Sequence, residues 1–130
     1  MSQSELVRIK DIMTKHVISI NSSKTIKDAA KIMIDKNVSS LIVTQNREPV
    51  GIIRERDFLS KVIAGDSKFS DSVLNIMPST LIYADPEQTI WDVIDLMKAR
   101  KINSIPVIDH KSEILGMVKF SDFLKAFSFD

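Results

Sequence analysis

Two short stretches of the sequence each lead from a glycine, through apolar residues and a cation, to an aspartate. The first is "GIIRERDFL", residues 51–59, and the second is "GMVKFSDFL", residues 116–124, in the other half of the chain. Asp57 and Asp122 occupy the same place in the two stretches, directly before Phe-Leu. A carboxylate in such a place can cap the start of a helix, or it can accept hydrogen bonds from a ligand. The residue types alone leave both uses open.

Cations stand near both aspartates, although not equally. Arg54 and Lys119 each lie three residues before the aspartate of their own stretch. The first stretch adds Arg56 next to Asp57, where the second has Ser121. A guanidinium or an ammonium can bind phosphate, and it can equally stay solvated or pair with the carboxylate. We therefore expect two unequal sites, of which the one around Asp57 is better suited to a polyphosphate.

The whole chain is repeated, and the repeat provides the elements that must position these residues. The run "TIKDAAKIM" at 25–33 is matched in the second half of the chain by "TIWDVIDLM" at 89–97. The spacing between the two glycine-led stretches is slightly longer than the spacing between these two runs, so the second copy holds one additional residue. We expect repeat 1 to cover residues 1–65 and repeat 2 to cover residues 66–130, together forming one compact domain.

Each copy has the pattern of a β-α-β-β-α unit. Thr25 and Thr89 stand three residues before an aspartate, and this capping-box pattern predicts the start of a helix. A second helix is expected to begin near Glu55 and near Phe120, with the recurring aspartate in its first turn. Apolar runs predict strands over residues 17–20, 39–44 and 49–53 in the first copy and over 80–84, 104–109 and 114–118 in the second. We expect an α/β fold with pseudo-two-fold symmetry, in which the sheets pack together and the helices lie outside, because open edges and apolar faces need cover.

The order of elements, the two copies and the glycine-led signature resemble the CBS domain family (cystathionine β-synthase domains). The resemblance covers essentially the whole chain as a stand-alone tandem pair, and the run "SIPVID" at 104–109 agrees with it. Such pairs are regulatory modules, so the resemblance implies an adenosine-containing ligand in a cleft between the copies: AMP, ADP, ATP, NAD or S-adenosylmethionine. It also implies a homodimer and a regulated partner protein, whose identity the resemblance does not give.

The resemblance assigns roles to individual residues. Asp57 and Asp122 become the candidates for binding the two ribose hydroxyls. The starts of the middle strands would offer backbone groups and apolar walls to an adenine; these residues are Ser39, Ser40 and Ile42 in the first copy and Asn103, Ser104 and Pro106 in the second. Arg54, Arg56, Lys119 and Ser121 complete the candidate set at the phosphate end. Gly51 and Gly116 lack side chains and could let a ligand approach the backbone closely.

The chain departs from the family pattern at one position in each copy. Family members usually carry Ser or Thr three residues before the aspartate, where the hydroxyl caps the helix and contacts phosphate. This chain has Arg54 and Lys119 there. Losing the hydroxyl costs ~1 kcal/mol per helix, and the cation gained can face a phosphate. A structural, protein-interacting module with degenerate pockets that binds no nucleotide is therefore the alternative function.

Composition excludes several other classes. The chain has 130 residues, a formal net charge of +1 and no basic run, so nucleic acid is an unlikely partner. It has no cysteine, which excludes disulfides and thiolate chemistry. It has no motif for a metal site or for a nucleophile with its base, so we expect neither a metal nor a catalytic residue, no required cofactor and no enzyme activity. The polar amino terminus and the lack of a bilayer-spanning apolar run lead us to expect a cytoplasmic protein without membrane contact.

The carboxyl-terminal stretch "FSDFLKAFSFD", residues 120–130, contains four of the six phenylalanines of the chain. Phe120, Phe123 and Phe127 recur at helical spacing. They can close the core beneath the last helix or form an interface with another molecule. The sequence leaves these two uses open.

Overall fold

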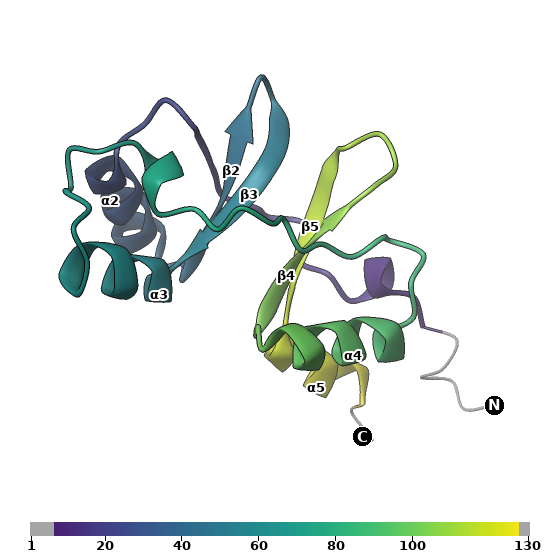
Figure 1. Cartoon of the computed structure of the whole chain (residues 1–130). Helices are drawn as coiled ribbons and strands as arrows, with labels where there is room; N and C mark the ends of the chain where they lie inside the picture. Colours follow the sequence, from purple (N-terminus) through teal and green to yellow (C-terminus); the bar gives the residue numbers. More distant parts are fainter. Residues whose placement is uncertain (1–6, 128–130) are drawn as a thin grey trace. The chain divides into compact units, whose positions relative to one another are not determined.

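The computed structural model describes residues 7–127, which form two compact units (Figure 1). The first unit is Ile18–Leu81, and the second unit consists of residues 7–17 together with residues 82–127. Residues 1–6 of the amino terminus and Phe129 of the carboxyl-terminal stretch lie outside the described residues. The predicted α/β class is confirmed, because each unit combines helices with a small sheet. The expected packing of the two sheets against one another stays a prediction.

The first unit contains a three-stranded sheet in the order β1-β2-β3. Its elements are β1 (Ser19–Asn21), α2 (Ile26–Lys36), β2 (Ser40–Gln45), β3 (Glu48–Arg54), α3 (Glu55–Phe58), the π-helix η2 (Leu59–Ile63) and the 3-10 helix η3 (Val73–Asn75). β2 pairs parallel with β1 and antiparallel with β3. Leu41 and Val43 of β2 pack with buried residues of α2 such as Ile26, and this cluster forms the core of the unit.

The second unit contains a two-stranded antiparallel sheet, β4-β5. Its elements are the 3-10 helix η1 (Ile9–Asp11), α4 (Ile90–Arg100), β4 (Ser104–Ile108), β5 (Ile114–Lys119) and α5 (Phe120–Ala126). The strand expected over residues 80–84 is wrong, because this segment contributes only an isolated parallel bridge between Ala84 and Val107. Pro86 and Pro106 flank that bridge, and neither can donate the backbone hydrogen bonds that would lengthen it.

The predicted capping boxes are confirmed at both long helices. Thr25 Oγ1 accepts a hydrogen bond from the Asp28 amide at 3.1 Å, and Asp28 Oδ2 accepts one from the Thr25 amide at 3.1 Å. Thr89 and Asp92 make the same two bonds at 3.1 and 3.2 Å. The start of α2 and the start of α4 are therefore determined by local sequence.

Each unit includes a segment from the other copy. Ile9 of η1 is fully buried in the core of the second unit, among residues such as Ile90 and Val118. Val73 and Ile76, which follow the first copy in sequence, are buried in the core of the first unit. The division of the chain in space therefore differs from its division into repeats. Residues 7–17 pack with the second copy and residues 66–81 pack with the first, and we call these two stretches the exchanged segments.

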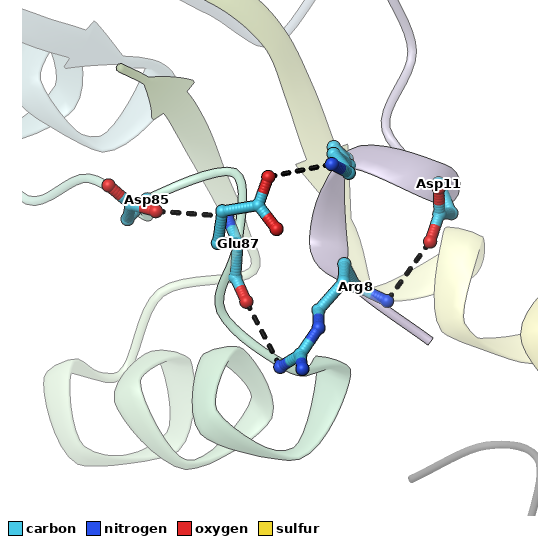
Figure 2. Close-up of polar contacts among 5 residues, drawn as sticks. Arg8, Asp11, Asp85 and Glu87 are labelled. Atoms are coloured by element: carbon cyan, nitrogen blue, oxygen red, sulfur yellow. Dashed lines mark hydrogen bonds and ion pairs between the residues drawn. The ribbon is translucent and has the colours of Figure 1, made fainter. Parts of the chain in front are cut away.

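Polar contacts secure η1 to the loop before α4 (Figure 2). Lys10 Nζ forms an ion pair with Glu87 Oε1 at 2.6 Å, and Arg8 donates from its guanidinium to the Glu87 carbonyl oxygen at 3.2 Å. Asp11 Oδ2 accepts from the Arg8 amide, and Asp85 Oδ1 accepts from the Glu87 amide. These contacts are exposed, so each contributes little on its own, and the buried Ile9 remains the main anchor.

Candidate functional site

The recurring aspartates occupy the same structural position in the two units. Asp57 is the third residue of α3 and Asp122 is the third residue of α5, and both are buried. Asp57 Oδ2 accepts a hydrogen bond from the Arg54 amide at 2.8 Å, and Asp122 Oδ2 accepts one from the Lys119 amide at 2.8 Å. One oxygen of each carboxylate thus satisfies the backbone at the start of its helix. The capping use considered from the sequence is therefore present in both units.

The second oxygen of each aspartate is differently placed. Within residues 7–127, neither Asp57 Oδ1 nor Asp122 Oδ1 makes a hydrogen bond to another residue. A carboxylate has capacity for about four hydrogen bonds over its two oxygens. Capping and ligand binding are therefore compatible in the same side chain, because the cap uses only part of that capacity.

The side chains at the cap position cannot replace the missing hydroxyl. Arg54 and Lys119 end β3 and β5, and neither makes a side-chain cap hydrogen bond. Guanidinium and ammonium groups only donate hydrogen bonds, so they cannot accept one from a helix amide. The departure from the family pattern therefore removes one half of the capping box and leaves the aspartate half in place.

The electrostatic surroundings of the two aspartates differ. Burial raises the pKa of Asp57, while the hydrogen bond from the Arg54 amide and the charges of Arg54, Arg56 and Lys61 act in the opposite direction. Burial also lowers the pKa of the half-buried Arg54, which the charge of Asp57 partly offsets. In the second unit, by contrast, Lys119 is exposed. Of Arg54 and Lys119, only Arg54 is thus partly buried beside its aspartate.

The structure brings the predicted strand residues to these helix starts. In the first unit the Ser39 carbonyl oxygen accepts a hydrogen bond from the Glu55 amide at 3.2 Å, and Ser40 pairs with Arg54 across the strands. The second unit repeats this arrangement: the Asn103 carbonyl oxygen accepts from the Phe120 amide at 3.1 Å, and the buried Ser104 pairs with Lys119. Ser121 is exposed on the first turn of α5, as Arg56 is on α3.

Ile42 and Pro106 lie further along the same strands. Both are buried, and they pair with Ile52 and Met117 respectively. Their neighbours in each strand point toward the helices, and side chains alternate along a strand. Ile42 and Pro106 therefore lie on the face of their own sheet that is turned away from α2 and α4 respectively, and each gives that face an apolar residue.

Gly51 and Gly116 do not leave the open space beside the backbone that was expected for a ligand. A side chain at Gly51 would meet the thioether of Met77, with Cγ at 2.7 Å, and one at Gly116 would meet the Thr14 carbonyl oxygen at 2.7 Å and Met13 Sδ at 2.8 Å. The exchanged segments thus fill the space that was expected to admit a ligand. The triplets "DIM" and "NIM", which place Met13 and Met77 at equivalent positions of the two copies, were the sequence signal for this contact.

Two general properties of the described residues bear on the kind of site. Among residues 7–127, no three side chains of His, Asp or Glu gather closely enough to hold a metal ion. None of the helices in this part of the chain has the length and apolar character needed to cross a bilayer. What the structure does bring together is a carboxylate, a cation and strand-end backbone groups, which is a set suited to hydroxyl and phosphate groups of a small molecule.

Known proteins share this architecture. The structure of the CBS domain pair of protein MJ0100, solved with 5′-methylthioadenosine and S-adenosyl-L-methionine, is 29% identical and has a TM-score of 0.83, covering 94% of this chain and 100% of that one. A hexameric CBS-CP12 protein from bloom-forming cyanobacteria is 34% identical with a TM-score of 0.81, over 92% of this chain and 67% of that one. Among sequence relatives, a homoserine O-acetyltransferase from Methanohalobium evestigatum is 30% identical over 88% of this chain, which spans only 23% of that protein.

The CBS segment is thus one part of some larger proteins, including enzymes, and the greater part of others, such as the CBS domain-containing protein YhcV of Bacillus subtilis, which is 26% identical over 88% of this chain and 81% of that protein. Its two copies here share the order helix, strand, strand, helix and the position of the aspartate. The family model for the CBS domain matches residues 9–64 and again residues 73–128. This chain therefore belongs to the CBS domain family and carries two CBS domains in tandem.

Proposed function

We propose that this chain is a regulatory module, without enzyme activity of its own, that binds an adenosine-containing ligand and transmits its presence to a partner protein. The observation that carries the proposal is the pair of buried aspartates, Asp57 and Asp122, each of which caps its helix with Oδ2 and keeps Oδ1 available. The binding of 5′-methylthioadenosine and S-adenosyl-L-methionine by the MJ0100 pair supports it. The ligands to consider are AMP, ADP, ATP, NAD and S-adenosylmethionine.

The proposed chemistry uses the carboxylates as acceptors for ribose hydroxyls. A hydroxyl that donates to an ionised carboxylate makes a charge-assisted bond, which is stronger than a neutral one. In the first copy Arg54 and Arg56 add cations beside Asp57, whereas the second copy offers Lys119 and Ser121. We therefore expect the first copy to favour ligands with more phosphate groups. Binding regulates a partner only if the ligand prefers one of two conformations of the module.

We also propose that the module acts as a homodimer. The hexameric assembly of the CBS-CP12 protein shows that a relative of this chain self-associates. The exposed apolar residues of this chain, which include Trp91 and Leu124, support self-association as well.

Calorimetric titration with the five ligands tests the proposal directly. The variants Asp57→Asn and Asp122→Asn keep an amide oxygen for the cap and lose the charge, so each should weaken binding to its own copy by about tenfold or more, as expected for a hydrogen bond to a charged group. Asp28→Asn and Asp92→Asn are matched controls, because these residues occupy the same third helical position in α2 and α4. If none of the ligands binds at millimolar concentration, the proposal fails. If both site variants bind the ligands as strongly as the unsubstituted chain does, the site assignment fails.

The alternative is an interaction module with degenerate pockets, and one observation favours it. Arg54 and Lys119 replace the hydroxyl that family members usually carry, so both copies depart from the usual ligand set in the same way. A partner that binds with the same affinity in the presence and absence of every nucleotide would support this alternative. Dependence of that affinity on one nucleotide would support the sensor.

A further inference from the structure

The second unit holds its exchanged segment, residues 7–17, by a backbone pairing. The Thr14 amide donates to the Met117 carbonyl oxygen at 2.9 Å, and the Met117 amide donates to the Thr14 carbonyl oxygen at 2.9 Å. Thr14 thereby forms an antiparallel bridge with β5, on the edge of that strand that faces away from β4. A residue that precedes the first unit in the chain is thus part of the sheet edge of the second unit.

The first unit lacks this pairing, because a proline stands in the equivalent position. The alignment of "DIMT" with "NIMP" makes Pro78 the counterpart of Thr14, and the two glycine-led stretches make Ile52 the counterpart of Met117. Proline has no amide hydrogen and cannot donate. Among residues 7–127, no backbone hydrogen bond or bridge joins Pro78 to Ile52. The methionine that precedes each of these positions lies against a strand glycine in both units, so the backbone pairing is what distinguishes the second unit.

The pairing connects the candidate site of the second copy to the exchanged segment 7–17. Met117 lies on β5 shortly before Lys119, whose amide donates to Asp122 Oδ2 at 2.8 Å. β5 passes directly into α5, which begins at Phe120. A ligand that fixes the Asp122 carboxylate therefore also restricts the end of β5. The two bonds between Met117 and Thr14 carry this restriction to the exchanged segment, because hydrogen bonds and rigid elements transmit such couplings.

Further contacts connect Thr14 to the rest of the second unit. The Met13 amide donates to the Ile9 carbonyl oxygen at 3.1 Å, and the fully buried Ile9 donates from its own amide to the Gln88 carbonyl oxygen at 2.8 Å. Residues 9–14 thus form one connected run from the core of the unit to the edge of β5. A change in how firmly Thr14 is held therefore reaches η1 and the loop before α4.

We propose that a ligand bound to the second copy is sensed by the exchanged segment 7–17, whereas a ligand bound to the first copy is not sensed by the exchanged segment 66–81. The inference rests on the ligand binding proposed above, and it names which copy sends the signal and which segment carries it. Ligand at Asp122 favours the state in which the bridge between Thr14 and Met117 is closed. The partner protein distinguishes the closed state from the open one by the accessibility of residues 7–17. Coupling between two sites is reciprocal, so the closed bridge in turn strengthens ligand binding to the second copy.

Amide hydrogen exchange measured by NMR tests the coupling in the unsubstituted chain, with AMP, ADP, ATP, NAD and S-adenosylmethionine as probes. A probe that binds in calorimetry should slow exchange at Thr14 and Met117 by about fivefold or more, as is typical of coupled sites. Exchange at Ile76, in the exchanged segment of the first unit, should not change. Asp122→Asn should abolish the slowing, and Asp57→Asn should preserve it. Binding without any slowing at Thr14 and Met117 would overturn the coupling and leave the proposed function intact, whereas the failure of all five probes to bind would overturn both.

Thr14→Pro tests the reciprocal effect, because it gives the second unit the residue of the first and removes the amide that donates to Met117. In a chain that also carries Asp57→Asn, so that binding reports on the second copy, it should weaken the calorimetric affinity by about fivefold or more. Thr14→Ala is the matched control, since it keeps the amide and loses only the hydroxyl, and it should bind as the Asp57→Asn chain does. Circular dichroism checks that the variants fold, and the exchange measurement above does not depend on them. An unchanged affinity in Thr14→Pro, or an equal loss in Thr14→Ala, would overturn the backbone coupling.

Discussion

The two units are built around two copies of one sequence pattern, yet one has a three-stranded sheet and the other a two-stranded one. In the first unit the Ile42 amide donates to the Ile18 carbonyl oxygen at 3.2 Å, and the Ser22 amide donates to the Thr44 carbonyl oxygen at 2.8 Å. These two bonds lie at the two ends of the β1–β2 pairing. At the equivalent positions of the second copy, the two donors are replaced by Pro106 and Pro86.

The prolines explain why the second unit keeps only the middle of this pairing. The Ala84 amide still donates to the Pro106 carbonyl oxygen at 2.9 Å, and the Ile108 amide donates to the Ala84 carbonyl oxygen at 3.0 Å. Proline has no amide hydrogen, so the bonds on either side cannot form. The two prolines at the donor positions thus account for the different number of strands in the two units.

Both units contain an exchanged segment. Removing the buried side chain of Ile9 from the segment of the second unit should have the largest effect on stability. Ile9→Ala should lower the free energy of unfolding by about 2–5 kcal/mol, because it leaves a cavity in a core whose other fully buried residues come from the second copy. Urea denaturation followed by Trp91 fluorescence measures the loss. Ile34→Ala, on the exposed side of α2, is the control and should change little. A loss below about 1 kcal/mol for Ile9→Ala would mean that the segment does not anchor the second unit.

The difference between the sheets can be transferred from one unit to the other. Ile42→Pro removes the amide donor of residue 42 in the central strand β2 and leaves the Ile18 carbonyl oxygen without this hydrogen bond. The substitution should therefore destabilise the first unit by roughly 1–3 kcal/mol. Amide hydrogen exchange should show faster exchange at Thr44, next to the lost bond. Ile42→Val keeps the donor and serves as the control. Unchanged exchange in the proline variant would refute the explanation.

The two glycines should respond unequally to a methyl group. In Gly116→Ala the new methyl group meets the Thr14 carbonyl oxygen. This backbone atom cannot move easily, because Thr14 and Met117 exchange two backbone hydrogen bonds of 2.9 Å. The substitution should therefore lower the free energy of unfolding by about 1–3 kcal/mol. Gly51→Ala meets the side chain of Met77, which is flexible and can move aside. The cost at Gly51 should therefore be the smaller of the two in thermal unfolding. The reverse order would show that Met77 is held more rigidly than Thr14.

The smallest expected effect compares two aspartates at the third position of helices within the first unit. Burial raises the pKa of Asp57 above 3.8, whereas hydrogen bonds from the Thr25 backbone and side chain lower the pKa of Asp28 below 3.8. Protonation of Asp57 thus favours the folded state, so its contribution to stability is present at low pH and is lost as the pH rises through the raised pKa. The contribution of Asp28 has the opposite sign: it is present above pH 3.8 and is lost as the pH falls through the lowered pKa. Carbon NMR of the carboxyl groups gives both values, and titration of Asp28 at the higher pH would contradict this account.

Local patterns were sufficient to predict most elements. The Thr-x-x-Asp boxes located the starts of α2 and α4, and apolar runs located the strand pairs β2–β3 and β4–β5. The failure over residues 80–84 had a local cause as well, because Pro86 and Pro106 were visible in the sequence. Their effect depends on which donors pair across strands, and that pairing becomes known only once the register is known.

The position of the two recurring aspartates could be predicted from the sequence, but their contacts could not. The position of Asp57 and Asp122 at helix starts followed from the repeat. That one oxygen of each is occupied by a backbone amide, and that Arg54 is half-buried while Lys119 is exposed, depends on packing that no local pattern encodes. The same holds for the segments beside Gly51 and Gly116, since contacts between residues distant in the sequence leave only weak traces, such as the repeated "DIM" and "NIM".

The placement of Ile9 in the core of the second unit also sets the order in which the chain can fold during synthesis. The first unit is one continuous stretch, Ile18–Leu81, and its core can close as soon as that stretch has left the ribosome. The apolar segment around Ile9 precedes the first unit in the chain, yet its partners in β5 follow that unit. During synthesis it must therefore wait for its core until the whole first unit has been made, and an unpaired apolar segment of this kind is prone to aggregation.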